Sequence, residues 1–327
     1  MTTYARFNRW LLAILLAIFG LVILTNVVID PYNIFQTSFL PIDLEGNLRF
    51  TKVEFLHEHR DQFNTFILGS SRAGVLSPTA VAQQIPGARA YNLSITAGTA
   101  REYLGLLRYL LDNQFTVKHV LVQIDLDYLS NRRNSIDYAF EPHPYTVDKS
   151  LLSAYWTYAT IFPTNVLKEK ITHNLKRNPH PVTIQYDSGV FVFWKAEQLI
   201  AEQGAAYFSS PPFLSRGIER DPYLDITHQV EALRAIAHLC LERRIDCVFF
   251  IPPHHHAVMD SLNEKGYQEA LLKLGEIADY YDFSGYNRIT LDSRNYYEPS
   301  HYRPFIGTMI VNRLYGESET GAQDSWG

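Results

Sequence analysis

The chain has 327 residues, of which 46% are hydrophobic and 19% charged, enough apolar side chains for one large domain or two small ones. Its formal net charge of −5 gives no support for a nucleic-acid-binding surface, so no nucleic acid is expected as a partner. The two cysteines, Cys240 and Cys247, match no zinc motif, and two thiols are favoured over a disulfide, which an exported location would still permit. No cofactor and no metal are predicted.

The N-terminus predicts a membrane anchor. Residues 10–29, Trp10 to Ile29, carry no charge, and twenty helical residues span about 30 Å, the thickness of a bilayer's hydrocarbon core. Arg6 and Arg9 precede this run and Asp30 follows it, which puts residues 1–9 in the cytoplasm. The alternative is a cleaved signal peptide, but its apolar core would be shorter, and no small-x-small cleavage pattern is found. We therefore expect a single-pass inner-membrane protein whose bulk lies in the periplasm or extracellular space.

Residues 30–61 are predicted to form a stalk with a short helix over Thr51 to Arg60, and from residue 62 strands and helices alternate. Near-continuous apolar strands separated by helices indicate a mostly parallel, flavodoxin-like doubly wound α/β sheet of five strands, with ligands at the strands' carboxyl ends. The predicted strands are Phe63–Leu68, Ala88–Leu93, Val117–Ile124, Asp246–Ile251 and Tyr280–Phe283. The predicted helices are Thr79–Ile85, Arg101–Asn113, Thr227–Arg243, Asp260–Ala278 and Arg303–Leu314.

Residues 128–225 interrupt this alternation within a domain predicted over 62–315. Helices are predicted there only near Ser150–Tyr158 and Asn165–Leu175. A segment this long is not an ordinary loop, so we interpret it as an insertion that caps the site. Residues 316–327 are small and polar, and we expect a frayed tail.

Two short motifs indicate serine chemistry. Gly69-Ser70-Ser71 follows the first predicted strand, and a hydroxyl in a sharp turn at a strand's carboxyl end is how α/β enzymes present a nucleophile. Such a turn alone is weak support, because ordinary turns have the same composition. The second motif, Glu298-x-x-His301, supplies an imidazole to accept the serine proton and a carboxylate to fix its tautomer. The alternative is that Glu298 and Ser300 cap the last helix.

Together these pieces resemble the SGNH/GDSL hydrolase superfamily over about residues 62–314, excluding most of the insertion. Gly69-Ser70-Ser71 resembles its first block and Glu298-x-x-His301 its last, which makes Ser71, His301 and Glu298 the implied triad. The stretch from Asn92 to Thr99 resembles the second block, whose backbone helps to form the oxyanion hole.

The match to the inner blocks is imperfect. In the usual second block a glycine stands where this chain has Ala97, followed here by Gly98. The third block is usually Gly-x-Asn-Asp, but Asp125-Leu126-Asp127 stands after the third strand, so no asparagine donor can be assigned. Asn92, Ala97 and Gly98 are therefore the expected oxyanion or substrate-binding positions.

Three further features flank the expected site. Arg72, beside the serine, is expected either to hold an anionic group or to pair with an acid. Asp125 and Asp127 are expected either to bind substrate or to cap and turn the chain. His254-His255-His256 follows the fourth strand, and because three consecutive histidines cannot all face one metal from a regular element, a polar contact of His254 at the rim is favoured over a metal site.

The N-terminal anchor and the Gly-Ser-Ser variant are similar to a membrane-anchored branch of the superfamily. That branch acts in acylation of cell-envelope polymers beside membrane-bound O-acyltransferases and includes D-alanyl-lipoteichoic-acid transfer and alginate and cellulose acetylation proteins. The resemblance implies an acyl group, most simply acetyl, carried on Ser71 and passed to a polysaccharide hydroxyl or to water. It leaves open an O-acyltransferase, an esterase, and a catalytically silent carbohydrate-binding scaffold for such an acyltransferase.

Overall fold

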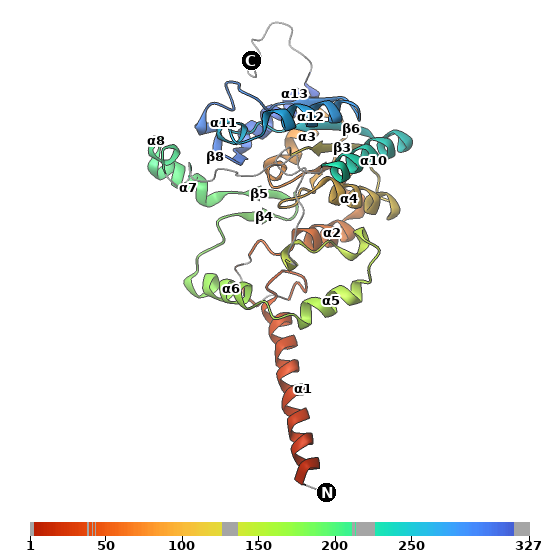
Figure 1. The fold of residues 1–327 in the computed structure, drawn as a ribbon, viewed down its shortest axis with the longest axis vertical. Helices are drawn as coiled ribbons and strands as arrows, with labels where there is room; N and C mark the ends of the chain where they lie inside the picture. Colours follow the sequence, from red (N-terminus) through yellow and green to blue (C-terminus); the bar gives the residue numbers. More distant parts are fainter. Residues whose placement is uncertain are drawn as a thin grey trace. The chain divides into compact units, whose positions relative to one another are not determined.

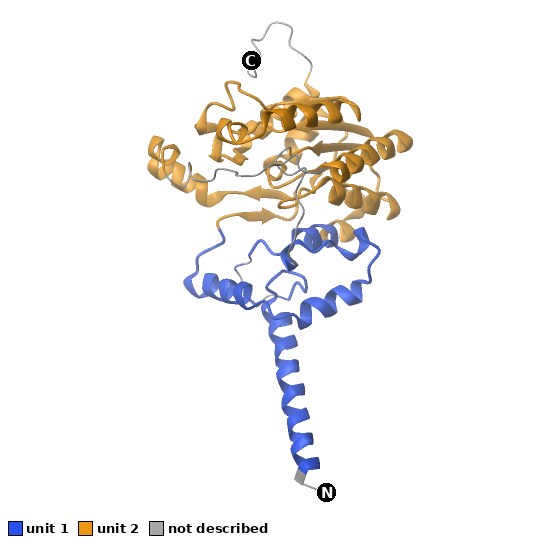
Figure 2. Cartoon of the chain, viewed as in Figure 1, with its two compact units in different colours: residues 1–54, 136–180 blue, residues 55–135, 181–327 orange. Residues whose placement is uncertain are grey.

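The structure is a computed structural model that describes residues 3–37, 39–40, 42, 44–125, 137–210, 213 and 226–316 (Figure 1). It divides into two compact units (Figure 2). The first unit comprises Met1–Glu54 with Ile136–His180, and the second comprises Phe55–Ser135 with Pro181–Gly327.

The second unit contains the expected α/β sheet. Its five strands are β1 (Thr65–Leu68), β2 (Ala90–Asn92), β3 (His119–Gln123), β6 (Asp246–Ile251) and β7 (Tyr280–Asp282). They lie in the order β2-β1-β3-β6-β7, and every neighbouring pair is parallel. This is the 2-1-3-4-5 order of flavodoxin-like doubly wound sheets, so the predicted α/β class with a five-stranded parallel sheet is confirmed.

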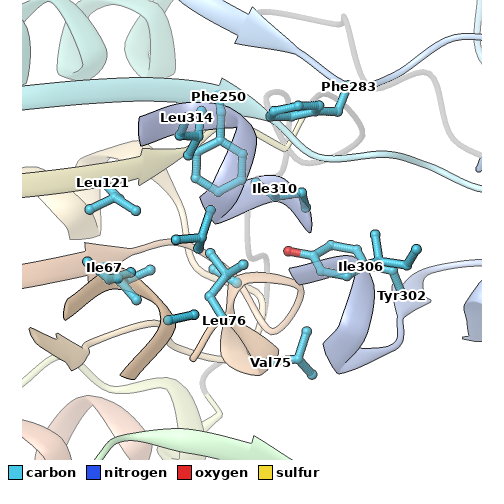
Figure 3. Close-up of a cluster of buried hydrophobic side chains, with 14 of the residues drawn as sticks. Ile67, Val75, Leu76, Leu121, Phe250, Phe283, Tyr302, Ile306, Ile310 and Leu314 are labelled. Atoms are coloured by element: carbon cyan, nitrogen blue, oxygen red, sulfur yellow. The ribbon is translucent and has the colours of Figure 1, made fainter. Parts of the chain in front are cut away.

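Alternate residues of the strands face opposite layers of helices, as the two-residue period of a strand requires. Ile67, Leu121 and Phe250 share one buried cluster with side chains of α3 (Pro78–Gln84) and α13 (Pro304–Tyr315), and Figure 3 shows these residues packed together. On the other face, the ring of Phe66 contacts that of Phe115, which in turn contacts Tyr109 of α4 (Ala100–Asp112). The helix α10 (Thr227–Arg243) packs against α4.

Local signals fix the helix ends of this unit. The Ser77 hydroxyl accepts from Ala80 N at the start of α3, where Pro78 occupies the first turn. Thr99 and Glu102 form a capping box at α4. At the end of α10, Arg244 takes the left-handed conformation that closes many helices.

The remaining elements of the second unit are short. They are β4 (Thr183–Gln185), β5 (Val190–Val192), α7 (Trp194–Gln203), α8 (Ala205–Phe208), α11 (His256–Met259), α12 (Glu264–Gly275), β8 (Tyr296–Glu298) and β9 (His301–Tyr302), with 3-10 turns at Arg60–Gln62, Ala73–Val75 and Ser293–Asn295. β4 pairs antiparallel with β5, and β8 with β9. Cys240 and Cys247 are both free thiols, and a hydrogen bond from Cys247 to Cys240 raises the pKa of Cys247 and lowers that of Cys240.

The first unit is built on α1 (Thr3–Ile29), which is long and apolar enough to cross a membrane. Its other elements are α2 (Leu48–Glu58), which runs into the second unit, α5 (Leu151–Thr160), α6 (Thr164–Lys176) and 3-10 turns at Tyr138–Phe140 and Pro144–Thr146. Residues 30–54 are not an extended stalk, because Tyr32, Ile34 and Phe50 are buried in a cluster with Tyr158. The predicted insertion is likewise divided: residues 136–180 complete this unit, and 181–208 belong to the second.

Candidate active site

The turn after β1 displays Ser71. It begins at Gly69, where an added Cβ would lie 2.5 Å from the Ala73 Cβ and 2.9 Å from the Gln123 Cβ, so only glycine fits there without displacing its neighbours. Ser70, next in the chain, is buried, and its hydroxyl accepts a hydrogen bond from Arg72 N at 3.3 Å. Ser71 itself is partly exposed.

Ser71, His301 and Glu298 lie in hydrogen-bond contact in that order. The Ser71 Oγ is 2.8 Å from His301 Nε2, and His301 Nδ1 contacts Glu298 Oε1 on the other side of the ring. Glu298 is buried, whereas the His301 side chain keeps 21% of its surface exposed. The bond to a carboxylate places a proton on Nδ1 and leaves Nε2 as the atom that accepts from the serine, as a serine nucleophile requires.

The β8–β9 pair positions the acid and the histidine. Glu298 is paired with His301 in the register of these two strands, and its second carboxylate oxygen accepts from Ser300 N at 2.9 Å. The alternative expected from the sequence, that Glu298 and Ser300 cap the last helix, does not hold, because the N-cap of α13 is Arg303 and has no side-chain cap. The carboxylate is thus used to fix the imidazole.

Arg72 pairs with an acid. Its side chain is 2% exposed, and Nη1 donates to Asp125 Oδ1 at 2.8 Å. Gln123 Nε2 donates to the same oxygen at 2.7 Å. The Arg72 Nε donates to the Ser300 carbonyl at 2.7 Å, which ties the turn that carries Ser71 to the segment that carries Glu298 and His301. Of the two roles expected for Arg72, the structure shows the pairing with an acid, and Asp125 is that acid. Asp127 lies outside the described residues.

Residues of the second block stabilise the turn that carries Ser71. Asn92 is buried, and its amide donates to the carbonyls of Ala73 and Leu76 at 2.7 and 2.9 Å. Gly98 N donates to Ile95 O at 3.1 Å. The expected oxyanion role of Asn92 and Gly98 is not supported, because both N–H donors are already bonded to carbonyl groups within the fold.

Ala97 and Ser71 retain features of an oxyanion site. Ala97 has a φ of +48°, the left-handed conformation that glycine adopts without strain, at the position where the resemblance expects a glycine. Among the described residues, Ser71 N donates no hydrogen bond within the fold. A backbone N–H of this kind is the type of donor that can stabilise a developing oxyanion.

Residues 190–203 include side chains beside His301 that were not predicted from the sequence as part of the site. The Phe193 ring lies 5.2 Å from the His301 ring and stacks on Tyr297 at 4.8 Å. On α7, Glu197 accepts from Tyr297 Oη at 2.8 Å and pairs with Arg303 at 2.8 Å. The signal was present in the sequence as alternating Thr-Ile-Gln and Val-Phe-Val runs around Asp-Ser-Gly, which predict a hairpin that ends at Phe193.

The three histidines after β6 have different surroundings. His254 is buried, so it does not form a rim contact. His255 Nδ1 accepts from Ala257 N at 3.2 Å, and its Nε2 donates to Ser293 Oγ at 3.0 Å. Burial, and secondarily the charge of His256, lowers the pKa of His255 to about 4. His256 is exposed and lies 3.2 Å from Asp260.

Within the described ranges, no group of three or more His, Cys, Asp or Glu side chains is arranged to hold a metal ion. No protein-family model matches the chain, and no curated protein matches it either. The chemistry of the site therefore has to be inferred from its geometry. A hydroxyl, an imidazole and a carboxylate in sequential contact can generate a serine alkoxide and protonate a leaving group.

Proposed function

We propose that this protein is an extracytoplasmic serine acyl enzyme that carries an O-acyl group on Ser71. The observation that carries the proposal is the Ser71 Oγ–His301 Nε2 contact of 2.8 Å, with Glu298 on the opposite ring nitrogen. His301 takes the serine proton while the Ser71 oxygen bonds to the acyl carbon, and the proton then passes to the departing donor oxygen. A second hydroxyl, from a sugar or from water, reverses these steps and releases the acyl group.

The class of substrate follows from the resemblance to SGNH hydrolases and from α1. The Ser–acid–His order, the left-handed Ala97 and the parallel sheet with ligand-facing carboxyl ends all support an SGNH-type arrangement. A helix able to anchor the chain in a membrane suits a polymer of the cell envelope, and an acetyl group on a polysaccharide is the substrate we favour. A membrane-bound O-acyltransferase is the proposed partner and source of the acyl group.

The second candidate is a catalytically silent carbohydrate-binding or scaffolding partner of that acyltransferase. This candidate is supported by the shortage of free oxyanion donors. The Asn92 amide and the Gly98 N–H both donate to acceptors within the fold, and the third block lacks its asparagine. Losing one oxyanion donor costs about 10² to 10³ in rate, so a site with few donors is slow or inactive on simple esters.

Labelling with a serine-directed fluorophosphonate separates the two candidates. The full chain, extracted in detergent, is compared with Ser71→Ala and with Ser300→Ala, a matched control that removes a partly exposed hydroxyl from the same site but keeps its backbone contacts. We expect labelling of the wild type and of Ser300→Ala, and none of Ser71→Ala. An unlabelled wild type, or labelling that survives Ser71→Ala, would favour the scaffold. Dependence of acetyl release on a sugar acceptor would then distinguish a transferase from an esterase.

A further inference from the structure

The helix α5 has a composition unlike that of a water-exposed helix. Its sequence, Leu-Leu-Ser-Ala-Tyr-Trp-Thr-Tyr-Ala-Thr, contains no charged residue, yet only Tyr158 and Ala159 are buried. Leu152 and Trp156, one helical turn apart and therefore on the same face, are 79% and 59% exposed. Exposed apolar side chains that gather in this way indicate a surface that contacts something other than water.

The contacts of α5 place it beside α1. The Asn26 amide donates to the carbonyls of Ala159 and Ile161 at 2.9 and 2.6 Å, and the ring of Phe19 lies 6.1 Å from that of Trp156. Figure 1 shows α5 at the end of α1 that is remote from the N-terminus.

These contacts set the level of α5 along the anchor. Asn26 and Phe19 precede Ile29, the last residue of α1, by three and ten residues, which is about 4.5 and 15 Å along a helix. The helix α5 thus runs beside the last turns of α1 and not beyond its end. If α1 crosses a bilayer, those turns lie in the leaflet nearest to the folded part of the chain.

Two threonine hydroxyls of α5 are satisfied in a way that suits a lipid environment. Thr157 Oγ1 donates to Ser153 O at 2.9 Å, and Thr160 Oγ1 donates to Trp156 O at 2.8 Å, so both hydroxyls bond within the helix itself. Internal bonds of this kind are needed where water cannot serve as a partner. Tryptophan is also the residue type enriched where a membrane meets water.

We propose that α5 is a second membrane contact: it lies in the interface of the outer leaflet beside α1, with Leu152 and Trp156 among the lipid acyl chains. The partner is the lipid itself, because Trp156 lies beside Phe19 of the apolar α1 and α5 offers no charge to a polar partner. Phe162, just beyond the helix, is a further large apolar side chain that is 70% exposed. The contact would hold the first unit at a fixed tilt on the membrane, independently of any catalytic role.

The test uses the full chain in lipid nanodiscs, after intact mass has verified that α1 is retained. Nitroxide spin labels are attached at Leu152→Cys and at Leu241→Cys in a background lacking Cys240 and Cys247. Leu241 is a matched control because it is equally exposed, at 79%, but is followed by Glu242, Arg243 and Arg244. We expect the label at 152 to be reached by oxygen and shielded from a water-soluble nickel complex, at a depth of about 5–10 Å. The label at 241 should be open to nickel.

A second measurement avoids the cysteine substitutions. Lipids brominated on their acyl chains should quench the fluorescence of a chain whose only tryptophan is Trp156, and should leave one whose only tryptophan is Trp194 unquenched. Nickel access at 152, or absence of quenching at Trp156, would overturn the proposal. Shielding of residue 152 from both oxygen and nickel would also overturn it, because it would indicate a protein partner or a second copy. Cleavage of α1 from the mature chain would also overturn the proposal.

Discussion

The buried pair of Arg72 and Asp125 gives the sharpest test of how the site is held together. Both side chains are 2% exposed, and the charged groups are 2.8 Å apart. Removing one partner of such a pair leaves an uncompensated buried charge, which costs about 3–5 kcal/mol. We therefore expect Arg72→Met and Asp125→Leu each to lower the free energy of unfolding by that amount. Replacing both residues at once should restore most of the loss, because no buried charge then remains.

In the double variant, the free energy of unfolding should recover but the reactivity of Ser71 should not. Arg72 also donates to the Ser300 carbonyl at 2.7 Å, and this bond ties the nucleophile turn to the segment bearing Glu298 and His301. The double variant recovers its fold but not this bond. A displacement of about 1 Å between reacting groups can cost about 10² in rate, so we expect fluorophosphonate labelling of Ser71 to be slower by that order.

The assays are urea unfolding of the detergent-solubilised chain and the rate of fluorophosphonate labelling, with Lys265→Met as a control. Lys265 pairs with Glu269 at 4.0 Å on an exposed helix face, and the loss of such a pair should leave the unfolding midpoint unchanged. The reasoning fails if the single variants unfold at the wild-type midpoint, since the pair would then carry no buried charge. It also fails if the double variant is labelled at the wild-type rate, since Arg72 would then not position the site.

Three further outcomes are expected. Glu298→Gln should slow labelling by about 10⁴, whereas Ser71→Ala should abolish it because no hydroxyl remains to react; labelling of Glu298→Gln at the wild-type rate would contradict the orienting role of the carboxylate. Burial lowers the pKa of His255 from 6.5 to about 4, so between these pH values the unfolded chain binds more protons than the folded chain. The contribution of neutral His255 to the free energy of unfolding is therefore fully present above pH 6.5, and up to about 3 kcal/mol of it is lost as the pH falls towards 4. His255→Asn should flatten this dependence in urea titrations. Gly74→Ala should lower stability by about 1–3 kcal/mol, because its Cβ would lie 2.6 Å from the Phe191 ring; an unchanged thermal midpoint would show that the hairpin moves aside freely.

The sheet and its helices could be predicted because their signals are local. The strand Asp246–Ile251 and the helix Thr227–Arg243 have the predicted bounds, since a continuous apolar run ends at Pro252 and a helical period ends at Arg244. The helix predicted from Asp260 begins at Glu264 instead, because Asn263 caps it by accepting from Gly266 N. The proline and cap positions were visible in the sequence, but which of several polar residues acts as the cap depends on tertiary packing.

The division of the insertion could not be predicted, because it depends on contacts between distant residues. In the first unit, His143 Nε2 lies 2.8 Å from Glu54, and the Lys170 ammonium donates to Asp30 O at 2.7 Å. Such pairs join segments about 90 to 140 residues apart and have no short-range pattern. The sequence likewise could not indicate that Arg72 would choose Asp125 over a substrate anion, since both choices satisfy a buried guanidinium equally well.

The geometry at His301 follows from three segments that are held independently. Ser71 is fixed by the turn after β1, whose glycine permits close packing against Gln123. His301 is fixed by the β8–β9 pair, and the residues at its outer ends, Tyr296 and Tyr302, are fully buried in the core shared by α3 and α13. The ring of Phe193, the residue that precedes α7, lies 5.2 Å from the His301 ring. Because each segment is anchored by contacts outside the serine–histidine–glutamate group, the Ser71–His301 contact forms without a ligand, and the His301 side chain still keeps 21% of its surface exposed.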